Sequence, residues 1–143
     1  MPLISFYGQS MADRFPTHAE QFNQNINSQA MNAANLARQQ MELLEHYLAA
    51  ALLTAVQAVE LRAKLVEGSY DARSVLSSAT APLYLAARRA AGGEPEADRP
   101  LLWNDFDGFI QPKVEGILRS LAPQGALIDA IEPVKASLLR FMA

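Results

Sequence analysis

Residues 17–67 contain no Gly and no Pro, the two residues that most often end a helix. The same stretch is rich in Ala, which has the highest intrinsic helix propensity. Gly68 follows directly and is well suited to end a helix. We therefore predict one long helix over residues 17–68, preceded by an irregular lead-in over residues 1–16.

Apolar residues recur at helical spacing along the second half of this stretch. Those that share a face are Leu44, Tyr47, Leu48, Ala51, Leu52, Ala55, Val56 and Val59. Ala49, Ala50 and Ala58 widen that face, so the helix is apolar over most of its girth. Such a helix is buried on several sides, and we expect an oligomeric helical bundle to cover it.

Shorter helices are predicted after the long one. A second helix is expected over residues 77–92, with Pro82 tolerated in its first turn and Gly93 just beyond its end. Residues 104–142 are expected to hold the C-terminal helices. No strand-like alternation competes, so the predicted fold class is all-α. It is a single helical segment over residues 1–143, with a long central helix in an oligomeric bundle plus three or four shorter helices.

Composition argues against several classes of function. The net charge is −3 and no stripe of Lys and Arg is present, so we expect no nucleic-acid partner. The chain has no cysteine, and therefore no disulfide, no thiolate metal site and no thiol nucleophile. The longest apolar run, residues 47–56, is interrupted by Thr54 and is far shorter than the ~20 residues of a transmembrane helix. No signal peptide is recognisable, so we expect no membrane association and a cytoplasmic location.

Amide side chains gather at the front of the long predicted helix. They are Gln21, Asn23, Gln24, Asn25, Asn27, Gln29, Asn32 and Asn35. Asn23 and Gln24 follow Glu20 at i+3 and i+4, so the three side chains share one face of a helix. A carboxylate beside carboxamides can hold a ligand's amino group while the amides orient a carbonyl oxygen. The alternative for Glu20 is a capping box with Thr17, three residues before it.

The order of residues in this block resembles a known family. Residues 19–28 read Ala-Glu-Gln-Phe-Asn-Gln-Asn-Ile-Asn-Ser, and residues 58–62 read Ala-Val-Glu-Leu-Arg. Both resemble the C-terminal part of the aromatic amino acid ammonia-lyases and 2,3-aminomutases. Three further blocks are most similar to bacterial tyrosine aminomutases and their phenylalanine, tyrosine and histidine lyase relatives: Tyr-Asp-Ala-Arg at 70–73, Leu-Ser-Ser-Ala-Thr at 76–80, and Asp-Arg-Pro at 98–100.

The resemblance implies a carbon–nitrogen lyase or aminomutase that acts on an aromatic amino acid. It implies that Glu20 contacts the substrate amino group, while Asn23 and Gln24 hydrogen-bond around the family's electrophile, a 4-methylidene-imidazol-5-one ring. That ring forms from Ala-Ser-Gly, which does not occur in this chain. The resemblance therefore assigns the ring to a larger N-terminal part, and the chain alone is an incomplete enzyme. The implied partners are the aromatic amino acid, a ring-bearing lyase polypeptide and further copies of the chain, which form a tetramer in the family.

A second hypothesis is a non-catalytic helical module for oligomerisation or assembly, derived from the same family, and the missing Ala-Ser-Gly favours it. A generic helical scaffold explains the bundle but not the amide block.

The remaining charged residues are expected to be structural. Glu60 and Lys64 are interpreted as a solvent-exposed i,i+4 pair, and Arg88 and Arg89 as cations near a helix end. The two histidines lack the paired Glu-x-x-His elements of a di-metal bundle, so no metal site is predicted.

Overall fold

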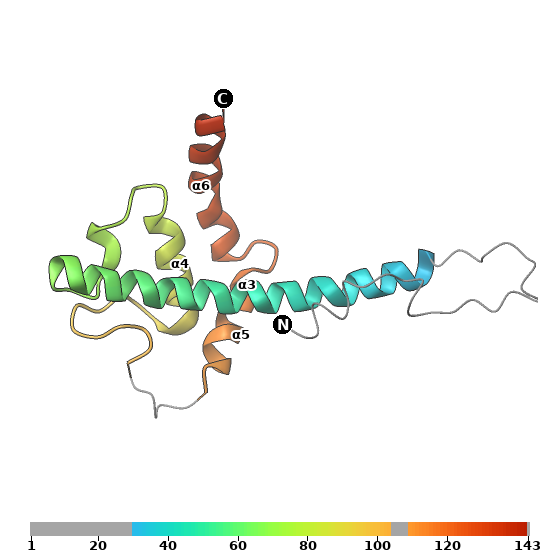
Figure 1. Ribbon diagram of the computed structural model, residues 1–143, viewed down its shortest axis with the longest axis horizontal. Helices are drawn as coiled ribbons and strands as arrows, with labels where there is room; N and C mark the ends of the chain where they lie inside the picture. Colours follow the sequence, from blue (N-terminus) through green and yellow to red (C-terminus); the bar gives the residue numbers. More distant parts are fainter. Residues whose placement is uncertain (1–29, 104–108, 143) are drawn as a thin grey trace, which may run out of the picture. The chain divides into compact units, whose positions relative to one another are not determined.

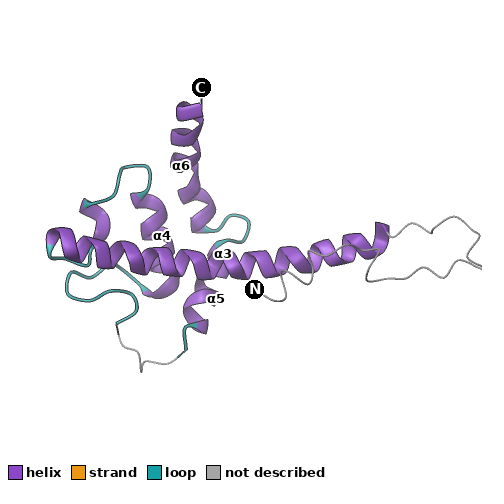
Figure 2. Cartoon of the chain, viewed as in Figure 1, coloured by secondary structure: helices purple, strands orange, loops and turns teal. Residues whose placement is uncertain are grey.

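The structure is a computed structural model that describes residues 30–103 and 109–142. The chain divides into two compact units, residues 1–46 and 47–143. The described residues form helices joined by loops, without a strand among them (Figures 1 and 2). The predicted all-α class is therefore confirmed for the described part of the chain. The lead-in over residues 1–16 and the first residues of the long predicted helix lie outside it.

Helix α3 (Ala30–Glu67) is the long helix, and it ends directly before Gly68, the first Gly after residue 17. Gly68 has a φ of 76°, a left-handed conformation that Gly adopts more readily than other residues. Its N–H donates to the carbonyl oxygen of Lys64 at 3.0 Å, and the ammonium of Lys64 donates to the carbonyl oxygen of Gly68 at 2.7 Å. These two bonds satisfy backbone groups that the end of the helix leaves without partners.

The described part of the first unit is the start of α3. Its side chains are mostly exposed from residue 33 onward. Arg38 pairs with Glu42 at 3.2 Å across one helical turn, and Nδ1 of His46 lies 2.8 Å from the carbonyl oxygen of Glu42. The imidazole therefore bonds to the backbone of its own helix.

Within the second unit, α3 turns a narrower face to the core than the sequence pattern predicts. The buried residues recur at helical spacing, and they are Ala49, Leu53, Val56, Glu60 and Ala63. Tyr47 and Leu48, which the pattern assigned to the buried face, are 45% and 44% exposed in the single chain. Leu65 is 80% exposed. The sequence pattern identified an apolar helix, but a single chain buries only part of the apolar surface around it.

Three shorter helices complete the second unit: α4 (Ala81–Gly92), α5 (Gln111–Ser120) and α6 (Ala126–Met142). Helix α4 begins four residues later than predicted because Ser77 starts a hydrogen-bonded turn, in which its hydroxyl oxygen accepts from the N–H of Thr80 at 3.2 Å. Gly93, with a φ of 102°, follows its last residue. In the view of Figure 1, the axis of α6 makes a steep angle with that of α3.

The core lies where α4 packs against α5 and α6. Ile117 and Leu127 are fully buried there, and Tyr84 and Leu101 are nearly so. Helices α4 and α5 approach closely at Gly116, where an added Cβ would lie 2.0 Å from the carbonyl oxygen of Ala90. Only a residue without a side chain fits this contact.

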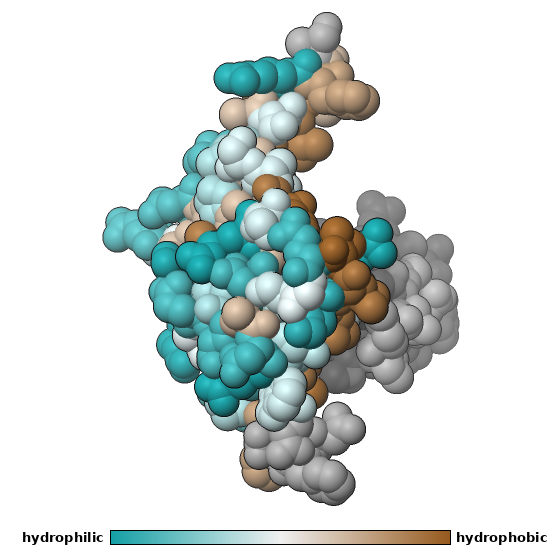
Figure 3. All heavy atoms as spheres, turned by 90° about the vertical axis from the view of Figure 1, so that its left-hand side faces the viewer, coloured by the Kyte–Doolittle hydropathy of each residue, from teal (hydrophilic) through white to brown (hydrophobic). Residues whose placement is uncertain are grey.

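The end of the second unit that carries the C-terminus of α3 is mostly hydrophilic, with hydrophobic atoms along one side (Figure 3). The far end of α6 also carries exposed apolar side chains, including Leu139 at 68% and Phe141 at 91%. None of the helices in the described ranges has the length and apolar character that a membrane crossing requires.

Candidate functional site

The three residues predicted to form the site, Glu20, Asn23 and Gln24, lie outside the described residues. Their assignment stays a prediction. Within the described ranges, no three His, Asp or Glu side chains converge as ligands for a metal ion. The polar chemistry that the structure does describe is concentrated in one buried cluster of the second unit.

The centre of this cluster is an ion pair between Glu60 of α3 and Arg88 of α4. Arg88 Nε donates to Glu60 Oε1 at 2.8 Å, and the two side chains are 3% and 1% exposed. The hydroxyl of Tyr84, one turn before Arg88 on α4, donates to the same oxygen at 3.1 Å. The other carboxylate oxygen, Oε2, accepts the backbone N–H of Leu101. Glu60 thus accepts three hydrogen bonds, which offset the cost of burying its charge.

The same cluster extends along the loop that follows α4. Arg88 Nη1 donates to the carbonyl oxygen of Gly93 at 3.1 Å. One turn before Glu60 on α3, Gln57 binds the backbone of Leu102 twice: its Oε1 accepts the N–H at 2.8 Å and its Nε2 donates to the carbonyl oxygen at 3.2 Å. Side chains of α3 and α4 therefore supply partners for a loop backbone that has no helix or strand partner of its own.

These contacts correct two expectations drawn from the sequence. Glu60 is not half of an exposed pair with Lys64, because its carboxylate points into the core and bonds to Arg88. Arg88 is not a solvated cation at a helix end, whereas Arg89 beside it is exposed and pairs with Glu94 at 2.5 Å. A signal was present in the sequence, since Glu60 lies four residues after Val56 on the face that begins with Ala49.

Burial and the adjacent Glu60 carboxylate both raise the pKa of the Tyr84 hydroxyl above its ordinary value of 10.0. Tyr84 therefore remains a neutral hydrogen-bond donor wherever the chain is folded at physiological pH. Glu60 already accepts three hydrogen bonds, and the side chains of Glu60 and Arg88 are almost fully buried. The cluster therefore stabilises the fold. In this conformation a dissolved substrate has no access to the cluster.

We expect the raised pKa of Tyr84 to make stability depend on alkaline pH. The folded chain binds this proton more tightly than the unfolded chain, so the stabilisation is complete below about pH 10 and is lost as the pH rises further. The free energy of unfolding of wild type minus that of Tyr84→Phe should therefore fall above about pH 10, by at most ~1.4 kcal/mol per pH unit. Urea unfolding from about pH 8 to pH 11 measures this difference. Tyr70→Phe, outside the cluster, is the matched control. A difference that is constant with pH would contradict the prediction.

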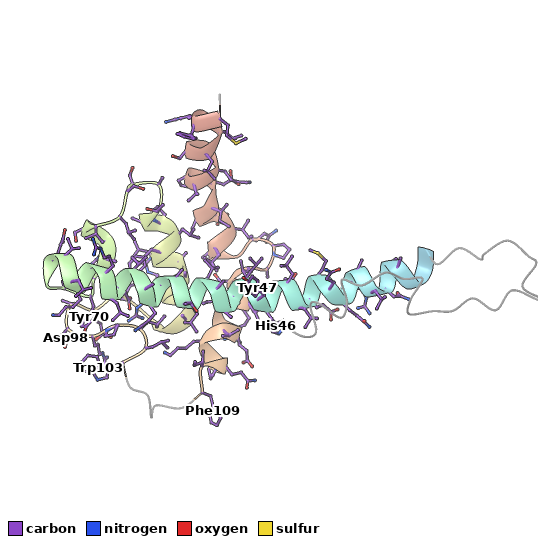
Figure 4. The ribbon with its side chains drawn as sticks, in the orientation of Figure 1. His46, Tyr47, Tyr70, Asp98, Trp103 and Phe109 are labelled. Carbon is purple, nitrogen blue, oxygen red and sulfur yellow. The ribbon has the colours of Figure 1, made fainter. Side chains whose placement is uncertain are left out.

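Two other surface features lie in the second unit. A groove of about 860 Å³ between α4, α5 and α6 has a floor of small residues, with Arg89, Arg119 and Asp129 among its lining side chains. Near the C-terminal end of α3, Tyr70 and Trp103 lie edge to face with ring centroids 6.5 Å apart (Figure 4). The Lys64 ammonium lies 5.1 Å from the centroid of the Tyr70 ring. Neither feature holds a buried, unpartnered polar group that would mark a ligand site.

Comparison with known proteins decides the ancestry of the chain. The family model described as aromatic amino acid lyase matches residues 10–89, which is more than half of the chain. The chain belongs to the aromatic amino acid lyase family. The matched residues include the amide block, α3 and most of α4, and with them the predicted site residues and Glu60, Tyr84 and Arg88.

Two relatives of this lyase family member are similar over almost its whole length. An aromatic ammonia-lyase from Loktanella atrilutea is 61% identical over 140 residues, which are 98% of this chain and 26% of the relative. A phenylalanine ammonia-lyase from Nostoc punctiforme is 46% identical over 138 residues, which are 96% of this chain and 24% of the relative. The chain thus spans about a quarter of the length of these curated relatives.

Proposed function

We propose that this chain is the C-terminal part of a methylidene-imidazolone-dependent aromatic amino acid ammonia-lyase or 2,3-aminomutase. The reaction is loss of ammonia from an aromatic amino acid to give an arylacrylate, or its re-addition at the β-carbon to give a β-amino acid. The observation that carries the proposal is the 61% identity with the Loktanella atrilutea aromatic ammonia-lyase across nearly the entire chain. The Nostoc punctiforme relative supports an aromatic substrate, because its name specifies phenylalanine.

In this proposal Glu20, Asn23 and Gln24 supply the chain's contribution to the active site. Glu20 binds the substrate amino group and takes its proton, and the carboxamides of Asn23 and Gln24 donate hydrogen bonds around the ring. Their chemistry fits the group, since an imidazolone presents a carbonyl oxygen and ring nitrogens as acceptors and carboxamides are matching donors. The ring supplies the electrophile for the reaction. Its Ala-Ser-Gly precursor is not in these 143 residues, so the chain acts only together with a ring-bearing segment.

The described helices support this role by providing a packed scaffold. The buried Glu60–Arg88 pair joins α3 to α4, and apolar side chains of α3 remain exposed in the single chain, among them Leu61 at 45% and Leu65 at 80%. We propose that further protein covers this surface in a tetramer. The same exposed surface favours the alternative function, a helical assembly module without turnover.

A chimaera distinguishes the two functions. In it, this chain replaces the aligned segment of the Loktanella atrilutea aromatic ammonia-lyase, so the ring-bearing part is supplied by a relative. We expect Asn23→Ala or Gln24→Ala to lower kcat for ammonia release by about 100-fold to 1000-fold, the usual effect of removing one preorganised donor. Glu20→Gln should lower kcat in the same direction, because it removes the proton acceptor.

The matched control is Asn35→Ala, which removes an exposed amide from α3 and should leave kcat unchanged. Assembly of every variant is compared by native mass spectrometry. If Asn23→Ala and Asn35→Ala have equal activity, the site assignment is wrong. If the chimaeras assemble but none turns over, the assembly module is the better account.

A further inference from the structure

The loop after α4, residues 93–102, is held by contacts with other segments, and we call it the strap. It contains Pro95 and Pro100 and forms no helix or strand. Its own charged side chains make only exposed pairs, such as Arg99 with Glu96 at 2.6 Å. Exposed pairs of this kind hold a backbone weakly. The strap therefore depends on buried contacts, which are the packing of its Leu101 side chain in the core and the hydrogen bonds that other segments make to its backbone.

Those contacts converge on the two ends of the strap. At its beginning, Arg88 donates to the carbonyl oxygen of Gly93 at 3.1 Å. At its far end, Glu60 accepts the N–H of Leu101. Because Arg88 and Glu60 are bonded to each other, a single ion pair holds both ends.

Two more anchors lie beside this pair. Gln57 makes two hydrogen bonds to Leu102, and the N–H of Tyr70 donates to the carbonyl oxygen of Ala97 in the middle of the strap at 3.1 Å. Tyr70 lies in the segment between α3 and α4, outside the strap. Its amide therefore reports on the middle of the strap, while the amides of Leu101 and Leu102 report on its end.

We propose that the strap opens and closes as one cooperative unit, locked by the Glu60–Arg88 pair, while α4, α5 and α6 stay folded. Opening breaks the contacts of Gly93, Ala97, Leu101 and Leu102 together and admits water to Glu60, Arg88 and Tyr84. The strap is thus a conformational device built over the one buried ionic cluster of the described residues. This inference concerns the chain's own dynamics and does not depend on the proposed catalytic function.

Amide hydrogen exchange on the full chain tests the proposal directly. We expect the amides of Tyr70, Leu101 and Leu102 to share one protection factor, lower than that of Ala87 in the middle of α4. In Glu60→Gln, all three should lose protection by about tenfold to a hundredfold, the range for losing hydrogen bonds to a charged group. Arg89→Gln, which breaks only the exposed Arg89–Glu94 pair at the beginning of the strap, should leave all three unchanged.

A second variant keeps the test decisive if Glu60→Gln does not fold. Gln57→Ala removes the two bonds to Leu102 and leaves the ion pair intact. A cooperative strap predicts that the amides of Tyr70 and Leu101 lose protection together with that of Leu102. Loss of protection at Leu102 alone would overturn the proposal, as would three different protection factors in the wild-type chain. Exchange of all three amides at the rate of Ala87 would also overturn it.

Discussion

Replacing Arg88 with Met is expected to lower the free energy of unfolding by about 3 kcal/mol, at the lower end of the range for breaking a buried ion pair. The substitution leaves the Glu60 carboxylate, which is 1% exposed, without its counter-charge. Methionine also cannot donate to Gly93, so the carbonyl at the start of the strap loses its partner. Release of the strap lets water reach Glu60, and this hydration limits the loss in the free energy of unfolding. Urea unfolding monitored by circular dichroism measures the change.

The neighbouring Arg89→Met is the matched control, because Arg89 has the same chemistry on the same helix but pairs with Glu94 in solvent. Its effect should stay within about 0.5 kcal/mol. The double variant Glu60→Leu with Arg88→Met is expected to be more stable than Arg88→Met alone, since no charge is then left buried without a partner. Equal effects of Arg88→Met and Arg89→Met would show that the buried pair contributes nothing to stability.

Gly116→Ala is expected to destabilise the chain by about 2 kcal/mol or more, although Ala is the better helix former by about 1 kcal/mol. The new Cβ would lie 2.0 Å from the carbonyl oxygen of Ala90 and 3.1 Å from its carbonyl carbon. Both atoms belong to the backbone of α4, so the clash cannot be relieved by turning a side chain. The helices must move apart, which loosens the packing of the fully buried Ile117 beside it.

The control for Gly116→Ala is Glu115→Ala, an exposed position on the same helix. Thermal unfolding should show a midpoint lowered by several degrees for Gly116→Ala and almost unchanged for Glu115→Ala. If Gly116→Ala were as stable as the wild type, α4 and α5 could not approach as closely as the structure shows.

Local signals in the sequence predicted where α3 and α4 end. Gly68 and Gly93 both adopt positive φ angles at those ends, and the chemistry of Gly alone is enough to expect this. The start of α4 was predicted less well. Ser77 begins a turn with Thr80, and the helix begins only with Ala81. The start therefore depends on which of several hydroxyls forms the turn.

The partners of buried groups could not be read from local patterns. The apolar periodicity of α3 placed Tyr47 and Leu48 on its buried face, yet both are exposed in one chain, because periodicity shows that a face is apolar without showing what covers it. The pairing of Glu60 with Arg88, 28 residues later, is a tertiary contact between two helices. A carboxylate on an apolar face predicts a buried partner, but it does not identify the partner.

The candidate site depends on a different kind of information. The shared face of Glu20, Asn23 and Gln24 follows from helical spacing, whereas their proposed roles come from the resemblance to the lyases and their aminomutase relatives. The family match over residues 10–89 includes these positions and supports the resemblance. These three residues lie outside the described residues, so their roles are tested by measuring the activity of variants.

The most direct measurement is therefore ammonia release from L-phenylalanine and L-tyrosine by the chimaera that carries this chain in the Loktanella atrilutea aromatic ammonia-lyase. We expect turnover of at least one of these amino acids by the chimaera and a loss of about 100-fold or more in its Asn23→Ala variant. An assembled chimaera that releases no ammonia, beside an active parent enzyme, would contradict the central claim that this chain completes an aromatic amino acid lyase.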